Sequence, residues 1–486
     1  MAKIVVLGAG ISGHTAAAHL RRKLSKEHEV LVVSPNRNYQ WVPSNIWVGI
    51  GRMKSKEIIF PLEPLYKRKG IGYKQSKAVS FHPEGDSTEA KPYILVEGVY
   101  GDTLGKQEKV TYDYLINATG PKLAFDMTEG LVPGTNKAYS VCTYDHAEHA
   151  ATALLELIAE LKNSDKKLKI LIGTGHAKST CQGAAFEYIL NVEKELVNHG
   201  VRDKAEITWI SNEYYLGDFG MDGMLMEYNG FNMKSKDMIE MIFEDRGIKW
   251  ILGAAVNKVQ DGIAHYENLE GEYKSETYDF AMLIPAFSGH GFQGFDKEGN
   301  NVTEKLFKGF MIVDADYTPR PYEEWTVQDW PETYQNPTYK NIFAPGIAFA
   351  PPHSISKPRT SKNGTEIFPA PPRTGMPSGM TARIVADNII DSIKLGKESL
   401  NHKGSMGNMG AACIASAGYG ITKGSGVSIT TFPIVPDYVK YADTGGRDIK
   451  KTFGDIGLAG HWVKLALHYA FIYKAKMKPF WWLIPE

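Results

Sequence analysis

An α/β fold with two doubly wound domains is predicted for this chain by three features of its sequence. An apolar strand followed by glycines and a helix begins at Ile4, and a second such segment begins at Leu168. Each has the βαβ pattern of a Rossmann-like domain. The third feature is the aromatic and lysine-rich segment 461–486, which predicts a C-terminal amphipathic membrane-binding region.

The expected domain boundaries follow from the order of these segments. The first domain is expected over residues 1–125, with its second part over 301–400, and the second Rossmann-like domain over 166–300. A connecting segment with a helix covers 126–165, and a C-terminal region covers 401–486. The irregular stretches 317–335 and 351–372 are long for structureless loops, so docking or lid roles are expected for them.

The composition excludes several classes of protein. Of 486 residues, 43% are hydrophobic and 23% charged, which is typical of a globular chain rather than a disordered one. The 55 basic and 55 acidic residues balance, so no nucleic-acid partner is expected. Three scattered cysteines fit neither a disulfide framework nor a zinc site, and no metal is expected. Because the first strand starts at once and no run of 18 apolar residues occurs, we expect neither a signal peptide nor a transmembrane helix.

The first glycine-rich turn predicts a dinucleotide site. Gly8, Gly10 and Gly13 follow an apolar strand with G-x-G-x-x-G spacing and open a helix, which lets the backbone approach a pyrophosphate closely. The acidic residue that usually ends the second strand is absent. Polar residues at that place could bond the ribose or phosphate instead: Ser34, Asn36 or Arg37.

Later segments indicate that the dinucleotide is FAD. A strand that ends in Ala-Thr-Gly is typical of two-dinucleotide flavoproteins, whereas residues 39–52 fit a packed Ω-loop or a flavin contact equally well. Residues 341–347 resemble the strand beside the ribityl chain, although its usual aspartate is missing. Residues 373–376 open a helix expected over 381–395, either at the flavin's pyrimidine edge or as an ordinary cap. The expected contacts are Pro43, Ser44, Asn45, Ala118, Thr119, Gly120, Pro121, Lys122, Gly346, Arg373, Thr374 and Gly375.

The second glycine-rich turn departs from a nucleotide site. After Gly173 and Gly175, Lys178 stands where the third glycine belongs, and Cys181 follows at the start of a helix. A helix N-terminus favours the thiolate form of cysteine, so a sulfur site is predicted there. Glu187 lies six residues further on, where it is either a proton carrier or an exposed helical glutamate.

Six segments resemble the sulfide:quinone oxidoreductases, which are two-dinucleotide-domain flavoproteins: PSNIWVGIGR, DYLINATGPKLAF, SVCTYDHAEHA, CQGAAFEY, NPTYKNIFAPGIA and GAACIASAGYG. The resemblance implies that Cys181 and Cys413 form the redox pair beside FAD, and that Cys142 lies nearer the sulfide entry. A histidine common in the family is replaced in EYYLGD by Asp218, so proton transfer there is in doubt or falls to Asp218 or His146. Ala184 stands where the family has a proline.

The resemblance implies oxidation of sulfide to sulfane sulfur or polysulfide, with two electrons passing through FAD to a membrane quinone. Two alternatives stay open at this point. A type II NADH:quinone oxidoreductase has the same fold but needs an intact second nucleotide turn, against which Lys178 and Cys181 argue. A non-catalytic flavin-binding redox sensor would use its cysteines only to report oxidation.

The C-terminal segment 461–486 predicts a monotopic helix in one membrane leaflet. One helical face collects the side chains of Trp462, Leu465, Ala466, Tyr469 and Ile472 or Tyr473. A basic rim is expected from Lys464, His468 and residues 474–478, because aromatic residues and lysines together favour the membrane interface. The alternative is that these aromatics pad the core or a subunit interface. The resemblance implies that Phe471, Trp481 and Gly375 contact the quinone. The protein is expected to bind the cytoplasmic face of the membrane, and a homo-oligomer stays an open alternative.

Overall fold

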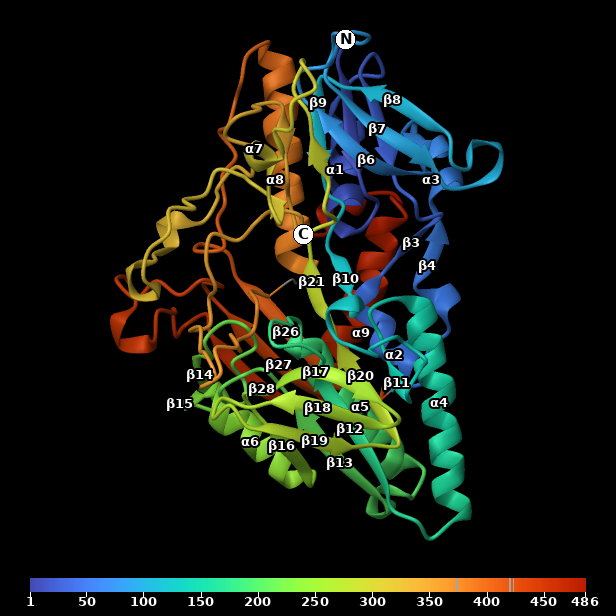
Figure 1. Cartoon of the computed structure of the whole chain (residues 1–486), viewed down its shortest axis with the longest axis vertical. Helices are drawn as coiled ribbons and strands as arrows, with labels where there is room; N and C mark the ends of the chain where they lie inside the picture. Colours follow the sequence, from blue (N-terminus) through green and yellow to red (C-terminus); the bar gives the residue numbers. More distant parts are fainter. Residues whose placement is uncertain (373–374, 419–420, 423) are drawn as a thin grey trace.

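The computed structural model describes residues 1–372, 375–418, 421–422 and 424–486. Two parallel sheets occupy opposite ends of the molecule, and a third sheet with helix α9 (Leu458–Ala475) lies against both (Figure 1). The predicted α/β class is therefore confirmed. Within the described residues, no helix is long and apolar enough to cross a membrane.

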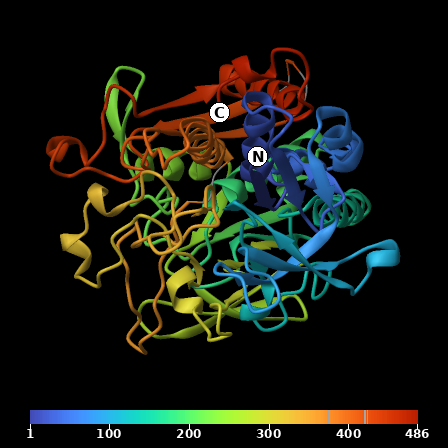
Figure 2. The same ribbon diagram turned by 90° about the horizontal axis from the view of Figure 1, so that it is seen from above.

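The first sheet has five parallel strands in the order β25-β9-β1-β2-β5. Its strands are β1 (Lys3–Leu7), β2 (Glu29–Val33), β5 (Gly72–Lys74), β9 (Tyr114–Asn117) and β25 (Ile342–Phe343). Helix α1 (Ile11–Lys23) runs beside α8 (Gly375–Leu395) at this end of the molecule (Figures 1 and 2). The helix expected over 381–395 thus begins six residues earlier, at Gly375.

The second sheet has the order β11-β20-β12-β13-β16 and is also parallel. Its strands are β11 (Ala138–Tyr139), β12 (Leu168–Thr174), β13 (Ala205–Ile210), β16 (Ile248–Ile251) and β20 (Phe280–Ile284). The helices of this half are α4 (Tyr144–Asn163), α5 (Gln182–Asn198) and α6 (Ser235–Asp245). A parallel sheet needs helical crossovers between its strands, so the two βαβ patterns in the sequence correspond to these two sheets.

Smaller elements complete and connect the two halves. The sheet β22-β6-β7-β8 comprises β6 (Ser76–His82), β7 (Tyr93–Gly98), β8 (Gln107–Thr111) and β22 (Gln293–Gly294). The sheet β17-β18-β19 comprises Ala255–Gln260, Ile263–Glu267 and Tyr273–Thr277. Strands β10 (Lys122–Ala124) and β21 (Ala286–Ser288) pair between the halves. The remaining pieces are β3 (Asn38–Gln40) with β4 (Ile59–Pro61), β23 (Phe307–Lys308) with β24 (Phe310–Met311), α2 (Asn45–Gly49), α3 (Leu62–Lys69) and α7 (Thr303–Leu306).

A third sheet was not expected from the sequence. It has the order β15-β14-β28-β27-β26, with β14 (Leu225–Tyr228), β15 (Phe231–Lys234), β26 (Ala411–Ala417), β27 (Ser425–Thr431) and β28 (Phe453–Gly457). Strand β26 consists mostly of Ala and Ser, and β14, β15 and β28 are only four or five residues long, so these four strands carry little of the β-branched alternation that predicts a strand. Strand β27 does contain Val, Ile and Thr. The glycine- and methionine-rich stretch 212–234 supplies two of the strands, β14 and β15.

The insertions 317–335 and 351–372 are held by hydrogen bonds rather than by regular structure. The first contains only the short 3₁₀ turns Tyr322–Glu324 and Val327–Asp329. It is fixed by the carboxylate of Asp314, which accepts backbone N–H bonds from Glu332, Thr333 and Tyr334 at 3.2, 2.7 and 2.6 Å. Both insertions are hydrogen-bonded to the rest of the protein, the second through residues such as Ser356 and Ala370, and their docking or lid roles stay a prediction.

A buried arginine ties the third sheet's loops to the loop that precedes β14. The guanidinium of Arg447 is almost fully buried and donates to the carbonyl oxygens of Gly223, Met221 and Ile434 at 2.7, 2.6 and 3.2 Å. Without it, three buried acceptors would lose their donor.

Arg447→Met is therefore expected to lower the free energy of unfolding by about 3 kcal/mol, because charge-assisted bonds to buried carbonyls are lost together. Urea unfolding followed by circular dichroism measures this, with Lys450→Met at an exposed position as the control. Equal unfolding midpoints for the two variants would contradict the assignment.

Candidate active site

The first glycine-rich turn leaves a cradle for a dinucleotide. A Cβ at Gly8 would lie 2.3 Å from the Ala118 carbonyl oxygen, and a Cβ at Gly13 would lie 2.1 Å from that of Gly8, so both positions require glycine for packing. A Cβ at Gly10 would meet no described atom within 4 Å. Gly10 is thus the glycine that faces open space, which is where the fingerprint places the pyrophosphate.

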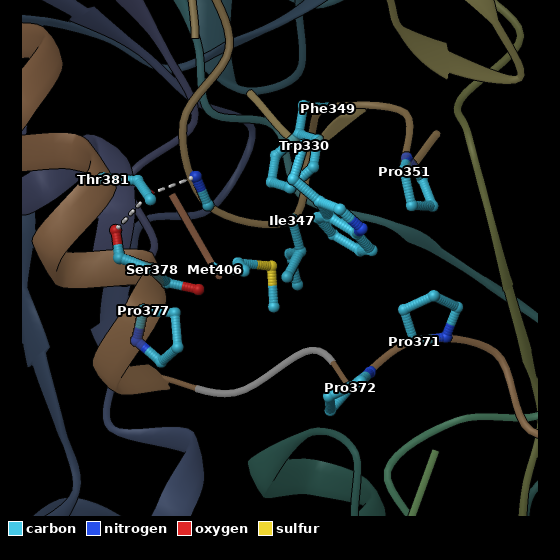
Figure 3. Close-up of a pocket in the computed structure, with 11 residues that line it drawn as sticks. Trp330, Ile347, Phe349, Pro351, Pro371, Pro372, Pro377, Ser378, Thr381 and Met406 are labelled. Atoms are coloured by element: carbon cyan, nitrogen blue, oxygen red, sulfur yellow. Dashed lines mark hydrogen bonds between the residues drawn. The ribbon is translucent and has the colours of Figure 1, made fainter. Parts of the chain in front are cut away.

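Helix α8 and the segment after β25 are joined to α1 beside this turn. Ser12 Oγ donates to the Ser378 carbonyl oxygen at 3.0 Å, and the N–H of Gly346 donates to Thr381 Oγ1 at 2.9 Å. An apolar pocket opens at this joint, and Figure 3 shows Ile347, Met406 and Pro377 turned toward its centre from three segments. Gly375 contacts Ile11 at the start of α1, whereas Arg373 and Thr374 lie outside the described residues.

Several other predicted cofactor residues have contacts within the protein. Ser34 is buried and its Oγ accepts the N–H of Asn36 at 3.3 Å. Ser44 Oγ bonds His468 Nδ1 at 2.8 Å, and Asn45 Nδ2 donates to the Val141 carbonyl oxygen at 2.8 Å. Residues 118–121 follow β9 at the first turn, where Thr119 Oγ1 donates to Asn117 Oδ1 at 2.8 Å. Lys122 is exposed and pairs with Asp126 at 2.8 Å.

The second glycine-rich turn is closed in two ways. A Cβ at Gly175, the counterpart of Gly10, would lie 2.7 Å from Leu131 Cδ2 and 3.2 Å from Leu283 Cβ, so side chains already fill that space. The insertion 351–372 then lies across the turn. The contacts that hold it there are Lys178 Nζ to Glu366 Oε2 at 2.5 Å, Phe368 N to Ala177 O at 3.1 Å, Ala370 N to Ser179 O at 3.1 Å, and Thr180 Oγ1 to Pro371 O at 2.9 Å.

The structure brings Cys413 to the start of the helix that follows Cys181. A Cβ at Gly183 would lie 2.9 Å from Cys413 Sγ, and Gly183 is the second residue of α5. Cys181 is the N-cap of α5 and has the left-handed backbone conformation, φ +67°, which is uncommon outside glycine. Such strain at a helix start is frequent at functional sites. Two cysteines from distant parts of the chain therefore flank one helix N-terminus.

Cys142 lies on the segment between β11 and α4, beside the α2 region. Its N–H donates to Ser140 Oγ at 3.1 Å, and the neighbouring carbonyl of Val141 is bonded by Asn45. Burial raises the pKa of the Cys142 thiol to about 11. The placement of Cys142 near the sulfide entry stays a prediction.

Glu187 is buried rather than exposed, which decides one alternative left by the sequence. Its carboxylate accepts the N–H of Ser416 at 3.2 Å and pairs with Lys464 Nζ at 2.9 Å. Burial raises the pKa of Glu187, and Lys464 opposes that rise. A buried, paired carboxylate beside the Cys413 strand retains the proton-carrier role as a prediction.

His146 and Asp218 lie in different surroundings. His146 lies in the first turn of α4, and its ring packs edge-to-face on the ring of Phe125. Burial lowers the pKa of its imidazole. The buried Nδ1 atom has no hydrogen-bond partner among the described residues. Asp218 accepts the N–H groups of Gly220 and Asp222 at 3.0 and 3.2 Å and a bond from Ser356 Oγ. Burial raises the pKa of Asp218 to about 6. Asp218 therefore attaches the insertion 351–372, through Ser356, to the loop before β14. None of the described contacts of Asp218 is with a cysteine.

The C-terminal helix has most of its polar residues turned inward. The predicted basic rim is therefore wrong for Lys464, His468 and Lys474, whereas Lys478, just after the helix, is exposed. His468 and Lys474 are buried and Lys464 is largely so, each with a partner inside the protein. The exposed stripe of α9 is apolar and aromatic, with Trp462 48% and Tyr469 61% exposed, so these two side chains do not pad the core of this chain. The ring of Phe471 stacks on Trp41 at 5.0 Å, whereas Trp481 is buried edge-to-face on His19 at 4.9 Å.

Comparison with known proteins agrees with this geometry. A family model for pyridine nucleotide-disulphide oxidoreductases matches residues 2–177. The chain is 30% identical over 419 residues to the sulfide-quinone reductase of Aquifex aeolicus, a match that spans 86% of this chain and 82% of that protein. This chain belongs to the sulfide-quinone reductase family. The mitochondrial sulfide:quinone oxidoreductase of Dictyostelium discoideum is 24% identical over 82% of this chain and 73% of its own length.

Solved structures place this sulfide-quinone reductase homologue in the same fold. The crystal structure of the Aquifex aeolicus enzyme superposes with a TM-score of 0.73 at 26% identity and covers 98% of this chain and 92% of that one. The NADH-bound NDH2 of Plasmodium falciparum has a TM-score of 0.61 at 14% identity, covering 97% of this chain and 94% of that one, and so shares the fold.

Sequence reasoning missed the polar residues that surround the Cys413 strand: Asn191, Ser416, His461 and Lys464. The only sequence signal was the spacing of Glu187 and Asn191, which lie four residues apart and therefore on one face of the helix. Their partners come from β26 and α9, so no local pattern could assign them.

Gly10→Val is expected to fold normally but to lose most of its flavin, by about tenfold or more in affinity, because the new side chain fills the open cradle. The backbone there, φ −75°, accepts any residue. Visible flavin absorbance per protein measures the loss, and Ser25→Val at the exposed end of α1 is the control. A Gly10→Val protein with full flavin content would show that the cofactor does not lie over this turn.

Proposed function

We propose that this protein oxidises sulfide to sulfane sulfur or polysulfide and passes two electrons through FAD to a membrane quinone. The observation that carries the proposal is the contrast between the two glycine-rich turns. The first is open at Gly10, whereas the second is filled at Gly175 and covered by residues 366–371, with Cys181 and Cys413 at its helix. The membership of the family supports the same activity.

The chemistry of the two cysteines explains the sulfide step. When Cys181 and Cys413 are joined through a disulfide or sulfur bridge, HS⁻ attacks one sulfur, and the S–S bond breaks. One cysteine becomes a persulfide and the other leaves as a thiolate that retains the electron pair of the broken bond. When that electron pair passes on to bound FAD and then to the quinone, the persulfide loses its proton and rejoins the thiolate as a bridge that is one sulfur longer. The next HS⁻ can then attack this bridge, so the sulfur chain would grow by one atom per two-electron cycle until it is released. Glu187 is the nearest assigned carboxylate for the protons of this cycle.

FAD fits the first turn, and the chain offers it a specific set of contacts. Gly8, Gly10 and Gly13 would hold the pyrophosphate at the N-terminus of α1, and Gly346 and Gly375 would lie along the ribityl chain and the ring. Bound FAD supplies the two-electron acceptor that sulfide oxidation requires. Ser34 and Asn36 remain candidates for the ribose, because their position after β2 is where the acidic residue of other dinucleotide sites stands.

The quinone and the membrane are proposed to meet the protein at α9. An exposed stripe of Trp462, Val463, Tyr469 and Tyr473 cannot be explained by packing within this chain, and aromatic side chains of this kind favour the bilayer interface. Phe471, stacked on Trp41, and Trp481 are the proposed ring contacts of the quinone, together with Gly375. Membrane association on the cytoplasmic face and a homo-oligomer belong to this proposal as well.

The alternatives explain less of the structure. An NADH:quinone oxidoreductase would need the second turn to be open at Gly175, where Leu131 and Leu283 now lie. A redox sensor would require neither the filled second glycine-rich turn nor the exposed aromatic stripe of α9, so this alternative leaves both features unexplained. We therefore retain the sulfide reaction as the function.

The purified flavoprotein is expected to be bleached by sulfide and hardly at all by NADH, because the second turn has no room for the nicotinamide nucleotide. An anaerobic titration that follows the flavin band, with and without a soluble quinone, measures both reactions. Fast bleaching by NADH would overturn the proposal. As a control, Cys413→Ala should retain FAD while sulfide no longer bleaches it.

Tyr469→Glu is expected to weaken binding to liposomes by about tenfold or more, because a charge then enters the apolar stripe that meets the bilayer. Sulfide should still bleach the flavin. Point substitutions are better tests here than removal of the helix, since its inner face packs within the protein. Co-sedimentation with liposomes is the measurement, and Tyr273→Glu, 70% exposed on β19, is the control; unchanged sedimentation of Tyr469→Glu would contradict the membrane assignment.

A further inference from the structure

A buried polar cluster joins the C-terminal helix to the strand that carries Cys413. Lys464 Nζ on α9 pairs with Glu187 Oε2 on α5 at 2.9 Å, and the two side chains are only 12% and 7% exposed. Ser416, three residues after Cys413 on β26, donates its N–H to the other carboxylate oxygen at 3.2 Å. The cluster therefore contains one positive and one negative charge that water barely reaches.

The carboxylate and the ammonium are held from several sides. Ser416 Oγ bonds the imidazole of His461, which lies one turn before Lys464 on α9. Asn191, one turn after Glu187 on α5, donates to the carbonyl oxygens of Glu187, at 2.8 Å, and of Ser416. Its Oδ1 accepts the N–H of Gly418 at 3.1 Å. These bonds fix α5, β26 and α9 relative to one another, so the charged pair has one arrangement.

The pair acts on Cys413 with two opposite charges. Burial raises the pKa of the Cys413 thiol to about 11, the negative charge of Glu187 raises it further, and the positive charge of Lys464 lowers it. The titratable side chains around the pair are Cys413 on β26 and His461 and His468 on α9. Cys181 caps the helix that carries Glu187, six residues before it. Lys464 is the only lysine or arginine that the described ion pairs place in this cluster.

We propose that Lys464 is a positioning residue for Cys413, whose ammonium offsets the Glu187 carboxylate and thereby favours the thiolate that the sulfide reaction needs. This inference rests on the proposed function, in which one of the two cysteines leaves as a thiolate, and it assigns that thiolate to Cys413. It also assigns a role to the inner face of α9. Lys464 and the exposed aromatic stripe lie on the same helix. The position of α9 against the protein therefore affects the ionisation of Cys413.

The signs of the expected changes differ for the two partners. Removal of the positive charge in Lys464→Met leaves a buried carboxylate and a thiol without a cation, so the thiol should lose its proton less readily. Removal of the negative charge in Glu187→Gln takes away the repulsion, so the thiol should lose its proton more readily. A loss of packing alone would raise the accessibility of Cys413 in both variants and move them in one direction.

The test measures alkylation of Cys413 by iodoacetamide in the FAD-loaded full chain, with Cys142 and Cys181 replaced by serine so that one thiol remains. At a fixed pH of about 8, we expect Lys464→Met to slow alkylation about tenfold and Glu187→Gln to accelerate it about tenfold, since one pKa unit is a tenfold change in thiolate. Lys464→Arg, which keeps the charge, should stay within about twofold of the parent. Lys478→Met, an exposed lysine of the same segment, is the matched control.

A change of both variants in the same direction, or no change in either, would overturn the proposal. If Lys464→Met fails to bind FAD, the double variant Glu187→Gln/Lys464→Met decides, because it has neither charge. Its alkylation should be slower than that of Glu187→Gln alone, and equal rates would overturn the role of Lys464. The assay uses neither sulfide nor quinone, so its failure is distinguishable from failure of the proposed function.

Discussion

The close approach of β26 to the first turn of α5 is the constraint on which the site depends. At Gly183 a side chain would collide with Cys413 Sγ, because a Cβ there would lie only 2.9 Å away. Glycine at this place lets the strand reach the helix N-terminus, where Cys181 is held in a left-handed conformation. The third sheet, the loops that Arg447 ties together and helix α9 all serve to hold that strand against α5.

The second glycine-rich turn illustrates how a nucleotide fold is converted to another chemistry. The strand and helix of the βαβ unit remain, and the dipole of α5 still points at the loop. The space for a nucleotide is removed by Leu131 and Leu283 beneath Gly175 and by the insertion above it. The positive end of the helix then faces sulfur instead of phosphate, which favours a thiolate for the same electrostatic reason.

Helix α9 differs from a helix on the surface of a water-soluble domain. Its polar side chains His461, Lys464, His468 and Lys474 face the protein, whereas the aromatic side chains of Trp462, Tyr469 and Tyr473 are exposed. Each inward group has a partner, among them Ser416, Glu187, Ser44 and Glu486, so burial does not leave a charge unpaired. The helix is therefore bound to the protein by these polar contacts as well as by the packing of Leu465, Phe471 and Ile472, and it leaves Trp462 and Tyr469 exposed.

The sequence by itself determined the α/β class, the two βαβ units, the open first turn and the unusual cysteine in the second. Those features depend on short-range spacing of glycines, apolar strands and helix starts, which one segment carries alone. Only the tertiary structure decided that Glu187 is buried, that Asp218 is hydrogen-bonded to the insertion 351–372, that Lys464, His468 and Lys474 face inward and that the second turn is closed. Each of these depends on a partner from a distant segment, such as Lys464 for Glu187 or Leu131 for Gly175. A charged side chain can be buried only when a partner compensates its charge, and here the partner comes from a distant segment. The local sequence around either residue therefore could not predict the burial.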